Sequence, residues 1–380
     1  MYLNWDVLTT LFSHYEHRKD MLALMSTCHA LRSAGTVYLL KFFVAILTDQ
    51  HLASLCQFLL AGAPTRPATL KQLAIRTYPT SAATVEMYLR VLAGANCLRN
   101  FEVWCGSPTI DSRIYEAISR LPNLESLTIR NFASDKCQWL HNMQSPVRTV
   151  DISFQGRPVD PVPLLASLAP SLEKLRVVFA CQGTDRSTVV YPYLRTLVTS
   201  SSAFEKIAPL VSAFPNLRDL TVFSCREEDD DGDELSVDRL ENQQAQTMQC
   251  WEVMDRVLAD VLLLYRLGLT CRVTRLEIPW LQSTYPDSAA PTFKDMFSTV
   301  LADTRPIILS LTIRPAFDIS QFPAYMSASV PEELKKLIIS LYITSETDIF
   351  ATLVSSISLL SIQAPKVGCN RTTCSQRCGT

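Results

Sequence analysis

Leu-Glu-Ser-Leu-Thr-Ile, residues 124–129, is the stretch that decides the fold, because its Leu-x-x-Leu-x-Ile frame recurs along the chain. Most successive starts of the frame lie 22 to 28 residues apart, with two longer intervals of 35 and 56 residues. Such a period is expected when one short strand and one helix form a repeating unit. The frame or a near variant starts at Leu70, Leu98, Leu124, Val147, Leu172, Leu194, Leu217, Val273, Ile308, Leu334 and Ile357.

The spacing within the frame predicts one strand in each unit. Its fourth and sixth positions, Leu127 and Ile129 in the best example, lie on the same face of an extended chain. Apolar residues at helical spacing follow between the strands, as at Ile114 and Ile118. One strand and one helix cannot bury their apolar faces alone, so neighbouring units must stack. The predicted fold class is therefore α/β, a solenoid with one parallel sheet covered by helices.

The frame resembles that of the leucine-rich repeat family over roughly residues 70–363. The family usually has an Asn or Cys beyond the sixth position, which satisfies backbone groups in the following loop. Here such residues stand at Cys225 and, one place early, at Asn131 and Cys105. The resemblance implies a horseshoe with the parallel sheet on its concave face and the helices outside.

The first 45 residues have a different pattern. Apolar residues predict a first short helix near Leu8, a second helix that begins after Asp20 and continues to Leu31, and a third from Val37 to Leu47. Residues 3–8, 20–24 and 27–32 together resemble an F-box, in the version found ahead of degenerate repeats in fungal proteins. Asn4 stands where most F-boxes have Pro.

The two resemblances imply a function by partner binding. An F-box docks on the Skp-type adaptor of cullin–RING ubiquitin ligases, so the chain is expected to be a substrate-recognition adaptor of an SCF-type ligase. The expected adaptor-binding residues are Leu3, Val7, Leu8, Leu11, Leu22 and Leu24. The repeat sheet would bind the protein substrate through side chains that alternate with the buried frame. The candidates there are Trp104, Arg130, Arg176, Phe223 and Arg314.

Three other interpretations stay open. The amino-terminal helices could be a plain cap, which repeat proteins need at the end of their hydrophobic core. The chain could be a protein-binding scaffold or an inhibitor without a ligase role. A metal-dependent enzyme would have to use its five histidines, but these have no paired cysteine motif or Glu partner at metal-ligand spacing.

The remaining composition favours an intracellular interaction protein. A formal net charge of −2 gives no reason to expect a nucleic-acid partner. With only ten glycines, no phosphate-binding loop or nucleophile elbow occurs, so we expect no enzyme activity and no cofactor. We see no secretory signal and no run long enough to span a bilayer. Twelve scattered cysteines fit reduced thiols, and we expect a cytoplasmic or nuclear protein that does not contact a membrane.

The pattern divides the chain as follows: an F-box at 1–45, a helical linker or cap at 46–69, the repeats at 70–363 and a disordered tail at 364–380. The 56-residue interval is predicted to hold an acidic insertion, 226–246, and then one helix from Trp251 to Leu267. The identity of the substrate cannot be derived from degenerate frames, because their exposed positions vary freely.

Overall fold

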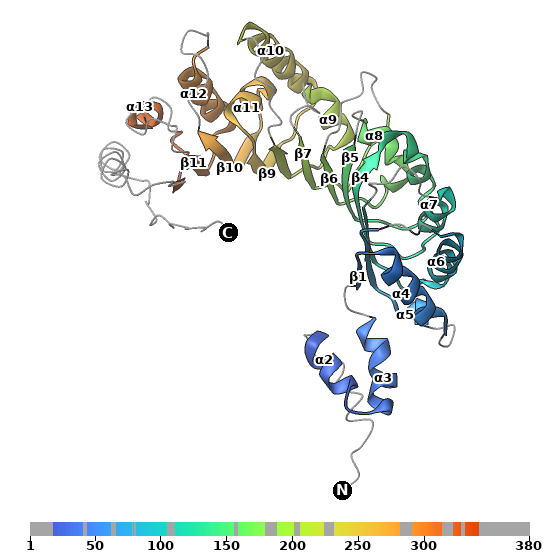
Figure 1. Cartoon of the computed structure of the whole chain (residues 1–380). Coiled ribbons are helices and arrows are strands. Elements are labelled where there is room, and N and C mark those ends of the chain that lie inside the picture. The colour runs from blue at the N-terminus through green and yellow to red at the C-terminus, as the bar shows by residue number, and fades with distance from the viewer. Residues whose placement is uncertain are drawn as a thin grey trace. The chain divides into compact units, whose positions relative to one another are not determined.

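The structure of the chain is a computed structural model (Figure 1). The structure describes residues 18–40, 44–61, 66–77, 79, 81–104, 111–155, 159–178, 188–200, 206–223, 232–281, 291–313, 322–327 and 331–341. Contacts divide the chain into two units, Met1–Pro158 with Pro163–Lys174 and Val159–Val162 with Leu175–Thr380. Each unit is described by itself.

The described strands follow one another in the sheet in the order of the chain. The strands of the first unit are β1 (Val44–Ile46), β2 (Gln72–Ile75), β3 (Asn100–Trp104), β4 (Ser126–Ala133) and β5 (Thr149–Gln155), and each pairs in parallel with the next. The strands of the second unit are β6 (Lys174–Val178), β7 (Thr196–Ser200), β8 (Asp219–Phe223), β9 (Val253–Leu258), β10 (Arg272–Leu281), β11 (Ile308–Ile313) and β12 (Lys336–Leu341). Lys174, the first residue of β6, is assigned to the first unit. The pairings from β7 to β12 are parallel too.

A helix follows most strands, and in each unit the helices that follow strands lie on one side of the sheet (Figure 1). Side-chain caps start several of them: Ser81 accepts from the Thr84 N–H, Asp260 accepts from the Leu263 N–H, and Thr292 forms a capping box with Asp295. In the first unit the helices are α2 (Arg18–Met25), α3 (His29–Leu39), α4 (Asp49–Ala61), α5 (Arg66–Thr69), α6 (Ala82–Gly94), α7 (Ser112–Ser119) and the 3₁₀ helix η1 (Ser134–Asn142). Near the boundary lie α8 (Pro161–Leu164) and η2 (Ala166–Leu168), and the second unit adds α9 (Ile207–Ala213), α10 (Gly232–Met248), α11 (Val261–Leu267), α12 (Phe293–Thr304) and α13 (Phe322–Ser327).

The repeated frame forms the core of both units. Leu124, Leu127 and Ile129 are all 0% exposed, and Leu217, Leu220 and Val222 are buried at the same positions of a later repeat. Adjacent frames pair in register, with Leu127 of β4 opposite Val150 of β5. The predicted fold class, an α/β repeat with a parallel sheet and covering helices, is confirmed.

Asparagines before the strands satisfy loop carbonyls. The Asn123 side chain donates to the Asn96 carbonyl oxygen at 2.7 Å, and the Asn216 side chain donates to the Pro192 carbonyl oxygen at 2.8 Å. Each amide thereby links its loop to the loop of the preceding repeat. The residues that were expected to make such a contact, Cys105, Asn131 and Cys225, follow the strands instead. Cys105 and Cys225 lie outside the described residues, and Asn131 has a left-handed backbone (φ 54°) where the β4–β5 register shifts.

The amino-terminal elements differ from the predicted helices. The second predicted helix is two helices, because α2 ends at Met25 and α3 starts at His29 after the extended residue Cys28. The third predicted helix, Val37 to Leu47, is wrong, since α3 ends at Leu39 and β1 pairs with β2. The sheet therefore begins one strand before the first predicted repeat at Leu70, and β1 crosses the boundary that we expected between residues 45 and 46.

Two later frames also differ. The helix predicted from Trp251 to Leu267 is wrong: this stretch holds strand β9 followed by helix α11. The 56-residue interval between predicted frames therefore contains a repeat that was not predicted. In β11 the frame is shifted by two residues, because Leu309 pairs with Leu337, and Leu311 with Ile339. The last predicted frame, at Ile357, and the tail 364–380 lie outside the described residues.

The predicted acidic loop is in large part helix α10, which polar side chains hold in place. The last four carbonyls of a helix have no partner within it. Buried Arg239 donates to the Tyr265 carbonyl of α11 at 3.0 Å, and buried Asn242 donates to the Arg266 carbonyl at 2.9 Å. Buried Gln246 donates to the Gly268 carbonyl at 2.8 Å. Helix α10 therefore caps α11, whereas residues 226–231 of the predicted insertion lie outside the described residues.

Candidate binding surface

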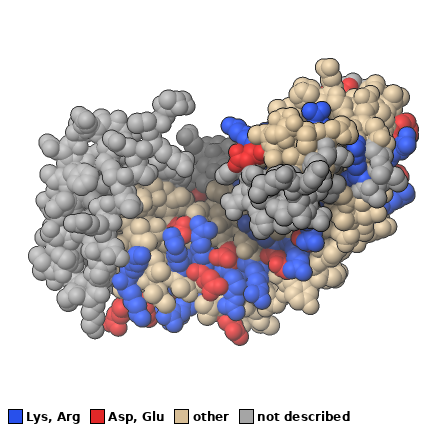
Figure 2. All heavy atoms as spheres, turned by 90° about the horizontal axis from the view of Figure 1, so that it is seen from below, with Lys and Arg blue, Asp and Glu red and all other residues tan. Residues whose placement is uncertain are grey.

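The face of the sheet that carries no frame residues is the main candidate surface. Side chains alternate along a strand, so a buried frame position is followed by one that points away from the helices. In β3 and β5 this alternation appears directly as half-buried and buried residues in turn. We call this side the open strand face. On the side of the molecule that faces the viewer in Figure 2, acidic and basic side chains lie close together.

In the first unit, Trp104 forms a small cluster with charged neighbours. Its indole N–H donates to Glu102 at 2.7 Å, and the Arg76 guanidinium lies 4.9 Å from the ring centroid. Arg76 also lies 3.7 Å from the Glu102 carboxylate. Cation–π contact and the hydrogen bond hold the half-buried ring in place, so Trp104 is not an isolated surface aromatic.

Arg130, the second candidate of this unit, forms a two-pronged ion pair. Its two terminal nitrogens donate to the two carboxylate oxygens of Asp151 at 3.0 and 2.6 Å. Two parallel hydrogen bonds of this kind fix the orientation of both side chains. Arginines at the start of the strands also pair, with Arg99–Glu125 at 3.2 Å and Arg148–Glu173 at 3.3 Å. The open strand face of this unit is therefore a ladder of matched charges.

In the second unit, the candidates Arg176 and Phe223 contact each other. The Arg176 guanidinium lies 5.9 Å from the centroid of the Phe223 ring, which is 45% exposed. These residues come from β6 and β8, so the contact passes over β7. The fifth candidate, Arg314, lies outside the described residues.

A second charged group of this unit, around Glu277, was not predicted to be part of the binding surface. Glu277 accepts two hydrogen bonds from Arg256, at 2.8 and 2.9 Å, and lies 2.7 Å from Arg275. The Arg256 hydrogen bonds, followed by the charges of both arginines, hold the pKa of Glu277 below its ordinary value of 4.5, against the opposing effect of burial. Alternation along β10 places Arg275 and Glu277 on this face, whereas Arg256 belongs to β9, a strand that was not predicted.

The adaptor-binding candidates are described only in part. Leu3, Val7, Leu8 and Leu11 lie outside the described residues. On α2, Leu22 is 43% exposed, whereas Leu24 packs against a cluster of Met21, Met25 and Leu31. One of the two leucines is thus free for a partner and the other belongs to the interior of the helix pair.

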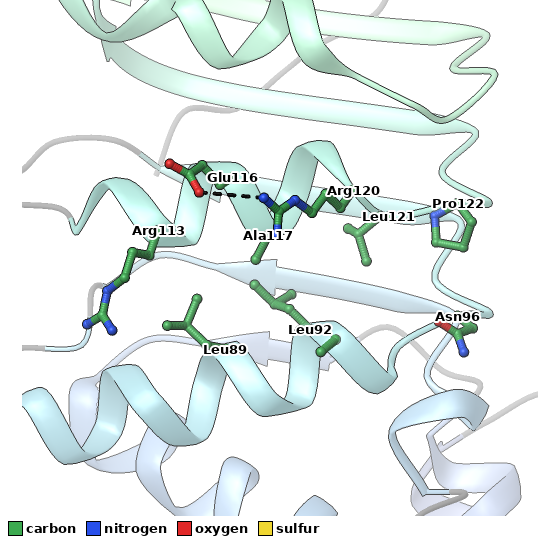
Figure 3. A pocket seen from close by; sticks show the side chains of 10 residues that line it. Leu89, Leu92, Asn96, Arg113, Glu116, Ala117, Arg120, Leu121 and Pro122 are labelled. Carbon is green, nitrogen blue, oxygen red and sulfur yellow. Dashed lines mark ion pairs between the residues drawn. The ribbon is translucent and has the colours of Figure 1, made fainter.

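A groove on the helix side is a weaker candidate (Figure 3). It has a volume of about 470 Å³, and Leu89 and Leu92 of α6 face Ala117 and Leu121 across it. Its charged rim is already paired: Arg113 contacts Asp111 and Glu86, and Arg120 lies 3.8 Å from Glu116. No buried polar side chain lines it, so nothing in it would select a particular ligand.

The described residues contain no group of three His, Cys, Asp or Glu residues that could hold a metal ion. Burial raises the pKa of the Cys56 and Cys271 thiols to about 12, so both stay protonated at neutral pH. None of the helices in the described ranges combines the length and apolar composition needed to span a bilayer.

The sequence matches no protein-family model and no curated protein. Among solved structures it is similar to a chain of the "Crystal structure of Rad7 and Elc1 complex in yeast", with 12% identity over 85% of this chain and 88% of that chain. The TM-score is 0.33, too low to carry an argument about fold or function.

Proposed function

We propose that this chain is a substrate-recognition adaptor of a cullin–RING ubiquitin ligase of the SCF type, without catalytic activity of its own. The amino-terminal helices would bind the Skp-type adaptor, and the open strand face would bind the protein substrate. The observation that carries the proposal is a helix pair with its own small core, in a sequence that resembles an F-box, ahead of parallel strand–helix repeats.

The small core supports a separate role for these helices. Among the described residues, its members Met21, Met25 and Leu31 and the partly buried residues around them all come from α2 and α3. A plain cap would use its apolar residues to cover the end of the repeats. Exposed Leu22 instead points away from this core. Burying such a side chain against a partner contributes roughly 25 cal/mol per Å² before ordering costs are subtracted.

A pull-down of the full-length chain with a purified Skp-type adaptor tests the proposal. We expect Leu22→Asp to weaken adaptor binding at least about tenfold, because a carboxylate buried without a partner costs more than 1.4 kcal/mol. Ala23→Asp, which adds the same charge at the next exposed position of α2, is the matched control and should retain most of the binding. Leu24→Asp should instead unfold the helix pair, visible as lost helical circular dichroism.

Failure of the intact chain to bind the adaptor, or equal binding by wild type and Leu22→Asp, contradicts the ligase assignment. The scaffold interpretation makes a different prediction in cells. Exchanging residues 1–45 for an unrelated helical cap would then leave function unchanged, whereas the ligase proposal requires turnover of the bound protein to stop.

A further inference from the structure

Helix α10 carries polar residues on its buried side and apolar residues on its exposed side. Its buried polar side chains are Arg239, Asn242 and Gln246. Its exposed apolar side chains are Val237, Leu240 and Met248, at 56%, 66% and 88% exposed. A helix on the surface of a globular protein ordinarily has the opposite arrangement, with its apolar stripe toward the core. Leu235 is the buried apolar residue that follows this ordinary rule.

Polar contacts attach α10 to its neighbours without help from the exposed apolar side chains. Three side-chain hydrogen bonds to carbonyls at the end of α11 hold it, as described above. Arg239 also forms an ion pair with Asp303 of α12, and Asp238 lies 3.1 Å from Arg266 of α11. Val237, Leu240 and Met248 therefore stay available for contact with another molecule.

The exposed apolar side chains lie along one side of the helix. Val237 and Leu240 are three residues apart and therefore adjacent, and Gln244 and Met248 follow at four-residue steps. At 1.5 Å per residue the row is about 17 Å long, or about three helical turns. Figure 1 shows α10 farther from the strands than α9 and α11 are, which leaves this side of the helix open. We call Val237, Leu240 and Met248 the α10 stripe.

The surroundings of the α10 stripe are acidic. Glu241, which follows Leu240, is exposed, and its basic neighbour Lys206 lies 3.9 Å away. Arg239, the basic residue of the helix, is buried. By sequence, residues 227–248 contain nine acidic residues and one basic residue, although 227–231 lie outside the described residues. This charge disfavours pairing with a second copy of the stripe or with an anionic lipid surface, and it favours a basic partner.

We propose that the α10 stripe binds an amphipathic helix of a partner protein in which lysine or arginine residues flank an apolar face. The apolar face covers the stripe, in the way that helices recognise apolar surfaces through residues at helical spacing. The flanking cations lie near the acidic residues and favour this partner over others of similar shape. The interface uses neither the amino-terminal helices nor the open strand face, so the proposal goes beyond the proposed function and does not depend on it.

Fluorescence anisotropy with the full-length chain tests the proposal. The probe is a labelled peptide of about 18 residues, long enough to form a helix on binding, with leucines at helical spacing and lysine elsewhere. One control peptide has the same composition in scrambled order, and another has glutamate in place of lysine. We expect the probe to bind with an affinity that falls as salt is added, and each control to bind at least about tenfold more weakly.

Glutamine substitutions assign the binding to the stripe, because glutamine removes apolar contact, adds no charge and is a good helix former. Leu240→Gln should weaken binding of the probe about tenfold, the loss expected for one leucine side chain covered by a partner. Val237→Gln should weaken it to a smaller extent. Val190→Gln is the matched control, because Val190 is an exposed valine of the same unit outside α10, and it should bind as wild type does.

Four results would overturn the proposal. They are no binding of the probe, equally tight binding of either control peptide, equal losses from Val237→Gln and Val190→Gln, and a lower urea midpoint for Leu240→Gln, which would place that side chain in the core. A dimer that Leu240→Gln dissociates would assign the stripe to a second copy instead. Binding to phosphatidylserine vesicles that the same substitution abolishes would assign it to a membrane.

The tests of the two proposals are separate. Leu22→Asp should leave binding of the probe peptide unchanged, because Leu22 belongs to α2 and lies outside the stripe. Leu240→Gln should leave the adaptor pull-down unchanged for the corresponding reason. Failure of one proposal is therefore distinguishable from failure of the other.

Discussion

The open strand face is built differently in the two units, although both rest on the same buried frame. From β2 to β5, arginines at Arg99, Arg130 and Arg148 each find a carboxylate on the next repeat. Around β7, Arg195 is exposed and has no ion pair among the described residues, and Arg218 donates to the backbone carbonyl of Val253. The same repeat can therefore use its polar side chains to link neighbouring strands or to leave charge available to a partner. Which use applies depends on whether the next repeat supplies an acid.

The largest expected effect tests whether the repeated frame is equally well packed in the two regions. Leu127 of β4 and Leu197 of β7 occupy the same frame position, and both are buried, at 0% and 2% exposed. Because each substitution leaves a cavity in a packed interior, Leu127→Ala and Leu197→Ala should each destabilise the protein by about 3 kcal/mol. Urea denaturation followed by circular dichroism measures this. A cost below about 1 kcal/mol at Leu197 would mean that the second region is loosely packed and that the comparison fails.

A smaller effect sharpens the contrast on the open strand face. A double-mutant cycle on Arg130 and Asp151, whose side chains are 28% and 18% exposed, should give a coupling energy of about 1 kcal/mol. The Arg148–Glu173 pair, at 65% and 53%, should give less than about 0.5 kcal/mol, because solvent screens it. Arg195→Ala should leave stability unchanged. Equal coupling in both cycles would show that the ladder contributes no stability beyond that of an ordinary surface pair.

The smallest effect concerns Glu277, where two arginines share one carboxylate. Hydrogen bonds from Arg256 hold the pKa of Glu277 below its ordinary value of 4.5, so the folded state binds this proton less readily than the unfolded state. The stability it contributes is present above about pH 4.5 and is lost as the pH falls through the lower folded pKa. Glu277→Gln should therefore reduce the loss of stability on acidification, measured by urea denaturation across this range. Arg256→Met should return the pKa of Glu277 toward its ordinary value in an NMR titration; an unchanged pKa would contradict the stated cause.

Periodicity was enough to predict most of the fold, and its failures have physical causes. The frame at Leu124 is unambiguous because polar residues separate its apolar positions. In β11, Ile308, Leu309, Leu311 and Ile313 are all apolar, and a shift by two residues keeps the same face of a strand inward. Pairing with both neighbouring strands decides the register, because Leu309 lies opposite Leu276 of β10 and Leu337 of β12. The frame of β9 escaped notice because it starts with Met254 and ends with Ala259.

The sequence was enough to predict which residues lie on the open strand face, but not which of them form ion pairs. Alternation alone identifies Trp104, Arg130, Arg176 and Phe223 as residues of the open strand face. Whether an arginine there is neutralised depends on side chains more than twenty residues away, such as Asp151, whose carboxylate binds Arg130, and therefore on the register of neighbouring strands. Helix α10 was missed for a related reason: buried Arg239, Asn242 and Gln246 hold it, and polar residues leave no apolar period to detect.

That arrangement around α10 sets the smallest piece of the array that can be exchanged. The side-chain oxygen Oδ1 of Asn242 accepts from the first N–H of α9, and its side-chain NH2 donates to the Arg266 carbonyl oxygen at the end of α11. The side-chain oxygen of Gln246 accepts from the Thr270 N–H. At Gly268, whose φ is +52°, an added Cβ would lie 2.8 Å from the Gln243 side chain. Grafting, deleting or recombining a single repeat at this point would leave the buried side-chain amides of α10 and the carbonyl oxygens at the end of α11 without hydrogen-bond partners. The smallest unit that can be exchanged here is therefore the three-helix block from α9 to α11.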